Sequence, residues 1–179
     1  MSERKERIGL VQVYTGNGKG KTTAALGLAM RAIGHNLTVY MIQFMKGRTN
    51  YGELHSAKRL PNLKIEQFGR PSFVDRKKPA KVDIEGAEKA LRRAKEVIDS
   101  DRWDIVILDE INVALDYKLI RVKDVLKLIR SKPHHIELVL TGRKAPKSVT
   151  SIADLVSEVR EVKHPYQTRK LKSRRGIEY

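Results

Sequence analysis

The sequence has 179 residues, no cysteine and a formal net charge of +16, from 37 lysines and arginines against 21 acidic residues. This length suits one domain with a substantial core, and the lack of cysteine excludes disulfides, thiolate catalysis and zinc–cysteine sites. The charge indicates a partner that carries phosphates, although a lysine-rich surface with no particular target explains it equally well.

The chain carries no sequence signal for a membrane or for export. No apolar run reaches the ~20 residues of a membrane helix. The charged start MSERKER is not followed by the apolar segment of a signal peptide. We therefore expect a cytoplasmic protein without a membrane partner.

Apolar, β-branched stretches alternate with helical patterns along the chain. Only residues 69–81, which hold two prolines and many charges, have the character of an insertion. Strands are predicted at 8–14, 37–44, 63–68, 103–108, 136–141 and 156–162. Helices are predicted at 21–34, 51–60, 83–100 with Asp83 as its cap, 111–130 in two pieces around Arg121, and 149–155. This alternation predicts an α/β fold with a mostly parallel sheet of about six strands and helices on both faces.

Between the first strand and the first helix lies the stretch YTGNGKGKTT, residues 14–23. Alternating glycines let successive backbone N–H groups face one anion, and the helix start adds its dipole. Lys21 would neutralise phosphate charge, and Thr22 would offer a hydroxyl to Mg²⁺. Thr15 stands where the common phosphate-loop pattern has its first glycine. The residues predicted to bind ATP are Gly16, Asn17, Gly18, Lys19, Gly20, Lys21, Thr22 and Thr23.

The stretch DIVILDE brings Asp109 and Glu110 to the carboxyl end of the fourth strand, where ligands of open α/β sheets bind. Alone, these would be two solvated acids at a helix start. Beside a phosphate loop they indicate a site for Mg²⁺ or Mn²⁺, with Thr22 as a further ligand. We interpret residues 1–179 as a single phosphate-loop domain of the RecA-like class.

Groups for nucleophilic or acid–base catalysis are missing from the sequence. There is no cysteine and no G-x-S-x-G pattern, and the neighbouring His134 and His135 would point apart. We therefore expect a protein that brings a nucleotide together with a second substrate that is itself reactive.

Several motifs, in this order, resemble the ATP:corrinoid adenosyltransferases of the CobA/BtuR/CobO type. The resemblance extends from about residue 9 to residue 179. The family's own loop reads G-x-G-K-G-K-T, so Thr15 fits it without a defect. The motifs are TGNGKGKTTAALGLAMRAIGH, IQFMKG, DIVILDEINVAL, LTGRKAP, ADLVSEVREVKHPY and the terminal GIEY.

The resemblance implies a reaction other than phosphoryl transfer. ATP binds with its triphosphate reversed relative to phosphate-loop hydrolases, and the cobalt(I) of a reduced corrinoid attacks the ribose 5′ carbon. Triphosphate leaves, and the product belongs to the biosynthesis or salvage of adenosylcobalamin, the vitamin B12 coenzyme. The resemblance also implies Mg²⁺, an electron donor such as a reduced flavoprotein, a homodimer and no nucleic-acid partner.

Position by position, the resemblance implies catalytic roles for Lys21, Arg31 and Glu110. Phe73 matches a loop phenylalanine that binds the corrinoid and helps displace its lower axial ligand. Two features depart from the family. Asp75 stands where enterobacterial members have tryptophan, and the sequence lacks their longer N-terminal extension, which helps cover the site.

A basic RecA-like ATPase that acts on nucleic acid is the alternative. It would share the fold and the loop, use the positive charge, and take Arg143 as a candidate arginine finger. Aromatic residues make up only 6% of the chain, and no basic–aromatic platform for bases is present. A corrinoid carrier without catalysis is a third interpretation, and the intact loop and Glu110 argue against it.

Overall fold

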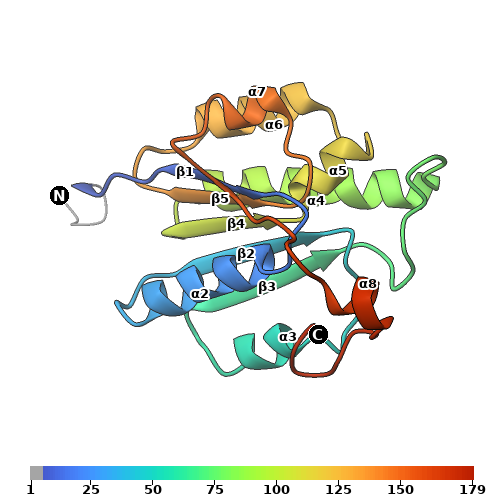
Figure 1. The fold of residues 1–179 in the computed structure, drawn as a ribbon. Coiled ribbons are helices and arrows are strands. Elements are labelled where there is room, and N and C mark those ends of the chain that lie inside the picture. Colours follow the sequence, from blue (N-terminus) through green and yellow to red (C-terminus); the bar gives the residue numbers. More distant parts are fainter. Residues whose placement is uncertain (1–5) are drawn as a thin grey trace.

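The computed structural model describes residues 6–179, which form one six-stranded sheet with helices on both faces (Figure 1). Neighbouring strands are parallel throughout this sheet. The α/β class and the parallel sheet expected from the sequence are confirmed. Residues 1–5, which hold most of the charged start used to argue against a signal peptide, lie outside the described residues.

The strand order is β3-β2-β4-β5-β1-β6, so β5 separates the strand before the phosphate loop from the strand before the acidic pair. Because all strands run in one direction, their carboxyl ends meet at one edge, where ligands of such sheets bind. The strands are β1 Val11–Thr15, β2 Val39–Phe44, β3 Leu63–Phe68, β4 Ile105–Asp109, β5 Glu137–Thr141 and β6 Leu155–Glu158.

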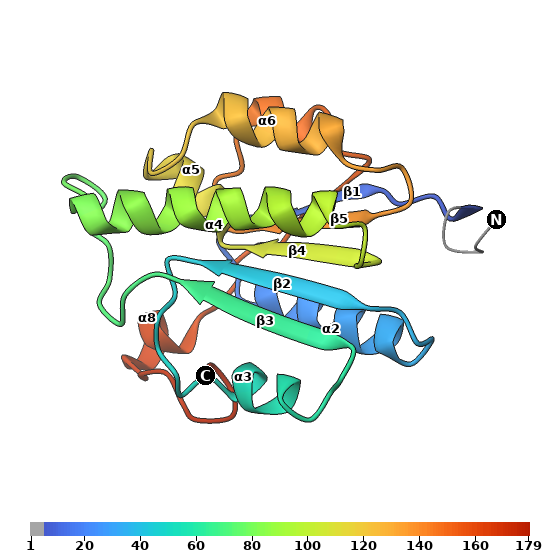
Figure 2. The same cartoon turned by 180° about the vertical axis from the view of Figure 1, so that it is seen from behind.

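Helices cover both faces, with α2 on one and α4 and α6 on the other (Figure 2). None of the helices within residues 6–179 is long and apolar enough to cross a membrane. The helices are α2 Lys21–Ile33, α3 Gly52–Ala57, α4 Lys81–Asp99, α5 Ile111–Asp116, α6 Val122–Ser131, α7 Lys147–Thr150 and α8 Pro165–Arg169.

Two apolar clusters, one on each face, form the core. Along β2, Val39 and Met41 point into the cluster under α2, while Tyr40 and Ile42 point into the cluster under α4. This alternation follows from the two-residue period of a strand. The apolar residues that α2 buries in its cluster are small, which lets the helix approach the sheet closely: Ala25, Ala29 and Ala32.

Several element boundaries differ from the sequence prediction, among them those of α4, α7 and β6, and the structure has one additional helix. Helix α4 begins at Lys81, so Asp83 lies in its first turn and is not the cap. Helix α7 ends at Thr150 because Asp154 bonds with both its backbone and side chain to Val11 of β1, which holds the chain extended. Strand β6 starts at Leu155 and ends at Glu158, after which the chain leaves the sheet. The additional helix is α8.

The 69–81 loop is closed at its base by a paired charge. The Arg70 guanidinium donates from Nε and Nη2 to the two carboxylate oxygens of Asp83, over 2.8 and 2.7 Å. Asp83 also accepts from the Ala80 N–H at 3.2 Å. These bonds join the start of the loop to the first turn of α4, so the loop is anchored at both ends.

The Asp83→Asn variant keeps the side-chain shape and removes the charge. The Arg70 guanidinium beside it holds the pKa of Asp83 below its usual value. The stabilisation is therefore present above the unfolded pKa of about 4 and is lost as the pH falls through the lower folded pKa. At pH 7 we expect the variant to lose about 1 kcal/mol, a modest value because Arg70 is partly exposed.

Chemical denaturation of wild type and variant between pH 3 and pH 7 measures this difference. The Glu85→Gln variant, which removes an exposed carboxylate in the same helix, serves as the control. A gap between wild type and Asp83→Asn that persists unchanged at pH 3 would contradict the assignment.

Candidate active site

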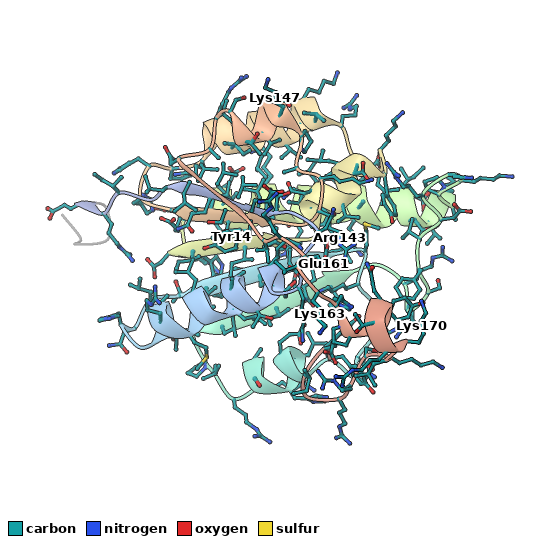
Figure 3. The ribbon with its side chains drawn as sticks, in the orientation of Figure 1. Tyr14, Arg143, Lys147, Glu161, Lys163 and Lys170 are labelled. Carbon is teal, nitrogen blue, oxygen red and sulfur yellow. The ribbon has the colours of Figure 1, made fainter. Side chains whose placement is uncertain are left out.

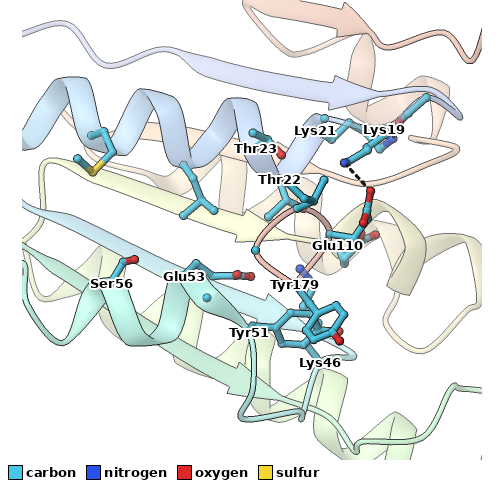
Figure 4. A pocket seen from close by; sticks show the side chains of 18 of the residues that line it. Lys19, Lys21, Thr22, Thr23, Lys46, Tyr51, Glu53, Ser56, Glu110 and Tyr179 are labelled. Carbon is cyan, nitrogen blue, oxygen red and sulfur yellow. Dashed lines mark hydrogen bonds and ion pairs between the residues drawn. The ribbon is translucent and has the colours of Figure 1, made fainter. Parts of the chain in front are cut away.

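A cavity of about 770 Å³ opens at the carboxyl edge of the sheet (Figure 4). One wall is the loop Gly18–Thr23 with the start of α2. The opposite wall comes from the segment after β2, including Tyr51 and Glu53, and Gly176–Tyr179 at the end of the chain also lines the cavity. Its volume falls within the range of small-molecule and cofactor sites.

Glycine is required at different positions of the phosphate loop for different structural reasons. Gly16 and Gly20 adopt positive φ angles of 92° and 120°, which favour glycine. A Cβ on Gly16 would lie 2.5 Å from the Val159 carbonyl oxygen, and one on Gly18 would lie 2.8 Å from Arg160 backbone atoms. The Gly18 N–H donates to the Val159 carbonyl at 2.7 Å. The chain leaving β6 therefore packs directly against the loop and fixes its path.

Thr15 has a defined structural role at the position of the missing glycine. It ends β1 opposite Glu158, and its hydroxyl accepts the Ala145 N–H at 3.1 Å. That bond ties the start of the loop to the connection after β5, which a glycine would be unable to do.

The two loop lysines have different partners. The Lys21 ammonium is buried and donates to the Gly18 carbonyl at 2.5 Å. Burial lowers the pKa of Lys21, and the positive charge of Arg143 lowers it further. The Lys19 ammonium instead pairs with the Glu178 carboxylate at 3.0 Å. Of the two loop lysines, Lys21 is therefore the one whose ammonium forms no salt bridge with a carboxylate.

A fully buried carboxylate, Asp109, joins the loop to the sheet. One oxygen accepts from the hydroxyls of Thr22 at 2.8 Å and Thr141 at 2.7 Å. The other accepts from the Lys46 ammonium at 2.7 Å and the Gln43 amide at 3.3 Å. Burial acts to lower the pKa of Lys46, but the Asp109 charge outweighs it and the pKa is raised. Lys46 therefore stays charged against Asp109.

Glu110 turns out of the strand into the cavity. It has a left-handed conformation, with φ of 63°, and its N–H donates to the Thr141 hydroxyl at 3.1 Å. Burial raises the pKa of Glu110, and the neighbouring Asp109 charge raises it further. A cation bound here would favour the charged form of this carboxyl group.

The oxygen groups near the loop fit a hard cation. Within residues 6–179, no group of three or more histidine, aspartate and glutamate side chains forms a preformed cage. The donors present are the Thr22 hydroxyl, the Glu110 carboxylate and, behind them, Asp109. This set suits Mg²⁺, which usually takes one or two carboxylates together with substrate phosphates and water.

The structure brings most of the predicted site residues together. Gly16 and Asn17 belong to the same loop but do not line the cavity. Arg31 is also absent from the lining: it is exposed on α2, where its charge acts on Tyr14. The predicted residues that line the cavity are Gly18, Lys19, Gly20, Lys21, Thr22, Thr23 and Glu110.

Phe73 lies outside the cavity, on the anchored 69–81 loop. Its side chain is 91% exposed, and the Arg48 guanidinium sits 5.5 Å from the ring centroid. Arg48 also donates to the Pro71 carbonyl at 3.0 Å. Asp75 accepts from the backbone N–H groups of the two lysines that follow Arg76, so it closes a local turn.

Sequence reasoning gave no role to several residues of the site. Lys46 and the terminal residues stood inside family motifs, but their partners are remote in sequence. Arg143, which the sequence indicates only as a candidate arginine finger of the alternative function, lines the cavity. Figure 3 labels its position in the fold. The lining residues to which the sequence assigns no role are Leu26, Met30, Lys46, Tyr51, Gly52, Glu53, Ser56, Leu60, Leu63, His164 and Gly176–Tyr179.

Comparisons with known proteins agree with the motifs. The family model described as "ATP:corrinoid adenosyltransferase BtuR/CobO/CobP" matches residues 7–179. A corrinoid adenosyltransferase of Sinorhizobium sp is 37% identical over 188 residues, covering 100% of this chain and 84% of the relative. Corrinoid adenosyltransferases of Escherichia coli and Salmonella typhimurium are each 32% identical, covering 100% of this chain and 90% of theirs. The chain belongs to the ATP:corrinoid adenosyltransferase BtuR/CobO/CobP family.

Proposed function

We propose that this corrinoid adenosyltransferase binds ATP in the cavity at the phosphate loop and transfers the 5′-deoxyadenosyl group to the cobalt(I) of a reduced corrinoid. The cobalt–carbon bond forms, the bond between C5′ and its oxygen breaks, and triphosphate leaves with that electron pair. The observation that carries the proposal is the convergence of Lys19, Lys21, Lys46 and Arg143 on one cavity.

The protein contributes charge and position, since the corrinoid supplies the nucleophile. Lys21 is buried and bonded only to a carbonyl oxygen in the described contacts, so its ammonium is available to a phosphate oxygen. A buried charge stabilises a leaving anion more than an exposed charge does. Arg143 lies close enough to lower the pKa of Lys21, and an anion between the two would relieve their repulsion.

Mg²⁺ belongs to the proposal as a companion of the triphosphate, whose charge it neutralises when bound. Thr22 and Glu110 line the cavity and would hold it. Asp109 has no exposed surface and orients the Thr22 hydroxyl from behind. The reversed orientation of ATP relative to phosphate-loop hydrolases is part of the same proposal.

The corrinoid side of the site rests on Phe73. Its ring is exposed on a loop that Arg70, Asp83 and Arg48 hold in place, as a contact to a large flat substrate requires. The homodimer and the reduced flavoprotein donor follow from the resemblance to the family, and the cytoplasmic location is the expectation from the sequence. They complete the proposal together with the expectation that nucleic acid is not a partner.

The nucleic-acid ATPase has no specific observation in its favour. The relatives that match the whole chain carry the name of a corrinoid adenosyltransferase. Four of the basic side chains, Lys19, Lys21, Lys46 and Arg143, line the cavity beside the phosphate loop.

Product analysis tests the function directly. Incubated anaerobically with ATP, Mg²⁺ and cobalt(I) corrinoid, the protein should yield triphosphate and an adenosylated corrinoid. Lys21→Ala should lose activity by a factor of about 100 or more, because a charge that stabilises the leaving group is gone. Lys89→Ala, an exposed change on α4, is the matched control. Release of ADP and phosphate, without a cobalt–carbon chromophore, would favour the alternative ATPase.

Glu110→Gln keeps the side-chain shape and removes the charge that the proposal assigns to Mg²⁺. We expect the Mg²⁺ concentration for half-maximal activity to rise on the order of 10-fold, because an anionic contact to the ion is weakened. Titration of the initial rate with Mg²⁺ measures this, with Glu88→Gln on α4 as the control. An unchanged Mg²⁺ requirement would assign Glu110 a purely structural role.

Phe73→Ala separates the reduction of cobalt from the transfer itself. If the ring displaces the lower axial ligand, the variant should be impaired most when the assay starts from cobalt(II). Cobalt(I) already lacks axial ligands, so assays that start from it should lose less. Phe73→Tyr retains the ring and should restore most of the rate. Equal losses from both starting states would remove the ligand-displacement role.

A further inference from the structure

The end of the chain returns to the phosphate loop. Gly176–Tyr179 lines the same cavity as Gly18–Thr23. The segment is a compact turn, in which the Gly176 N–H donates to the Tyr179 backbone oxygen at 2.7 Å. The Glu178 N–H donates to the Arg174 carbonyl at 3.0 Å. The terminus is therefore one wall of the nucleotide cavity (Figure 4).

Glu178 is the contact between this segment and the loop. Its carboxylate accepts from the Lys19 ammonium at 3.0 Å and from the Arg174 guanidinium at 3.1 and 3.3 Å. It also accepts the Arg174 N–H at 2.7 Å. Hydrogen bonds from Arg174, and then from Lys19, lower the pKa of Glu178 to about 2. The carboxylate is therefore charged at any working pH.

This charge stands where an anionic substrate group has to bind. Lys21 is bonded to a neutral carbonyl, so a phosphate displaces no carboxylate from its ammonium. Lys19 already holds a carboxylate, so a phosphate oxygen must share the ammonium or take it over. Two anions on one ammonium repel each other, and Arg174 offers Glu178 a second cation to keep.

We infer that Gly176–Tyr179 is a latch on the nucleotide site, in which Glu178 is an internal counter-anion that a phosphate of ATP displaces from Lys19. This rests on the proposed binding of ATP at the loop. The terminal segment is held against the loop while the cavity has no nucleotide, and it is released when the triphosphate takes Lys19. Triphosphate binding and movement of the terminus are then linked, each favouring the other.

The test is the affinity of the full chain for inorganic tripolyphosphate, measured by calorimetry at fixed ionic strength. Glu178→Gln removes the competing charge and should bind tripolyphosphate roughly two- to fivefold tighter, the effect of one partly exposed ion pair. Glu161→Gln removes a carboxylate from the same part of the chain, outside the cavity lining, and should bind as wild type does. Unchanged or weaker binding by Glu178→Gln would overturn the latch.

A second pair of variants separates the latch from a general effect of charge. In a Lys19→Ala background the latch has no cation to hold, so adding Glu178→Gln should leave the affinity unchanged. The same two- to fivefold gain in that background would show that Glu178 acts through the overall field, against the latch.

Hydrogen exchange gives a readout that does not depend on affinity. In wild type, saturating tripolyphosphate should speed exchange of the Gly176, Ile177 and Glu178 amides, which are hydrogen-bonded within the turn. Unchanged or slower exchange would indicate a fixed wall and would overturn the latch. Adenosyl transfer with an unchanged tripolyphosphate affinity in Glu178→Gln would reject the latch alone. Tighter tripolyphosphate binding by Glu178→Gln together with faster amide exchange in wild type, but without adenosyl transfer, would reject only the proposed reaction.

Discussion

The buried carboxylate of Asp109 organises the site. An unpaired charge in a protein interior is strongly unfavourable, so this position requires compensating donors. They come from the phosphate loop through Thr22, from β5 through Thr141 and from the segment after β2 through Lys46. One buried charge thereby fixes the relative positions of three segments that are distant in sequence.

Three lysines of the cavity have partners within the protein. Asp109 holds Lys46, Glu178 holds Lys19, and the Gly18 carbonyl holds Lys21. These partners are a buried salt bridge, a partly exposed one and a single bond to a neutral group. In the proposed function a triphosphate would recruit Lys21 most easily and Lys46 least easily.

The sequence predicts those features of the structure that depend on the local pattern of residues. The parallel sheet follows from alternating apolar segments, and the loop follows from its glycines and its place between β1 and α2. It does not predict contacts between remote residues, such as Lys46 with Asp109 or Lys19 with Glu178. The early end of α7 has the same cause, because Asp154 pairs with β1. Arg31 was assigned by resemblance, and its exposed position on α2 does not bring it to the cavity lining.

The segment Lys46–Arg48 contacts both the 69–81 loop and the cavity at the phosphate loop. Gly47 follows Lys46, and a Cβ on Gly47 would lie 2.4 Å from the Gly69 carbonyl oxygen, so the two backbones touch. Arg48, the next residue, contacts the ring of Phe73. A side chain at Gly47 would push the two loops apart, and glycine is the residue that allows this approach. The loop that presents Phe73 is thus positioned by the short segment that Asp109 holds through Lys46, which connects the corrinoid side of the proposed site to its nucleotide side.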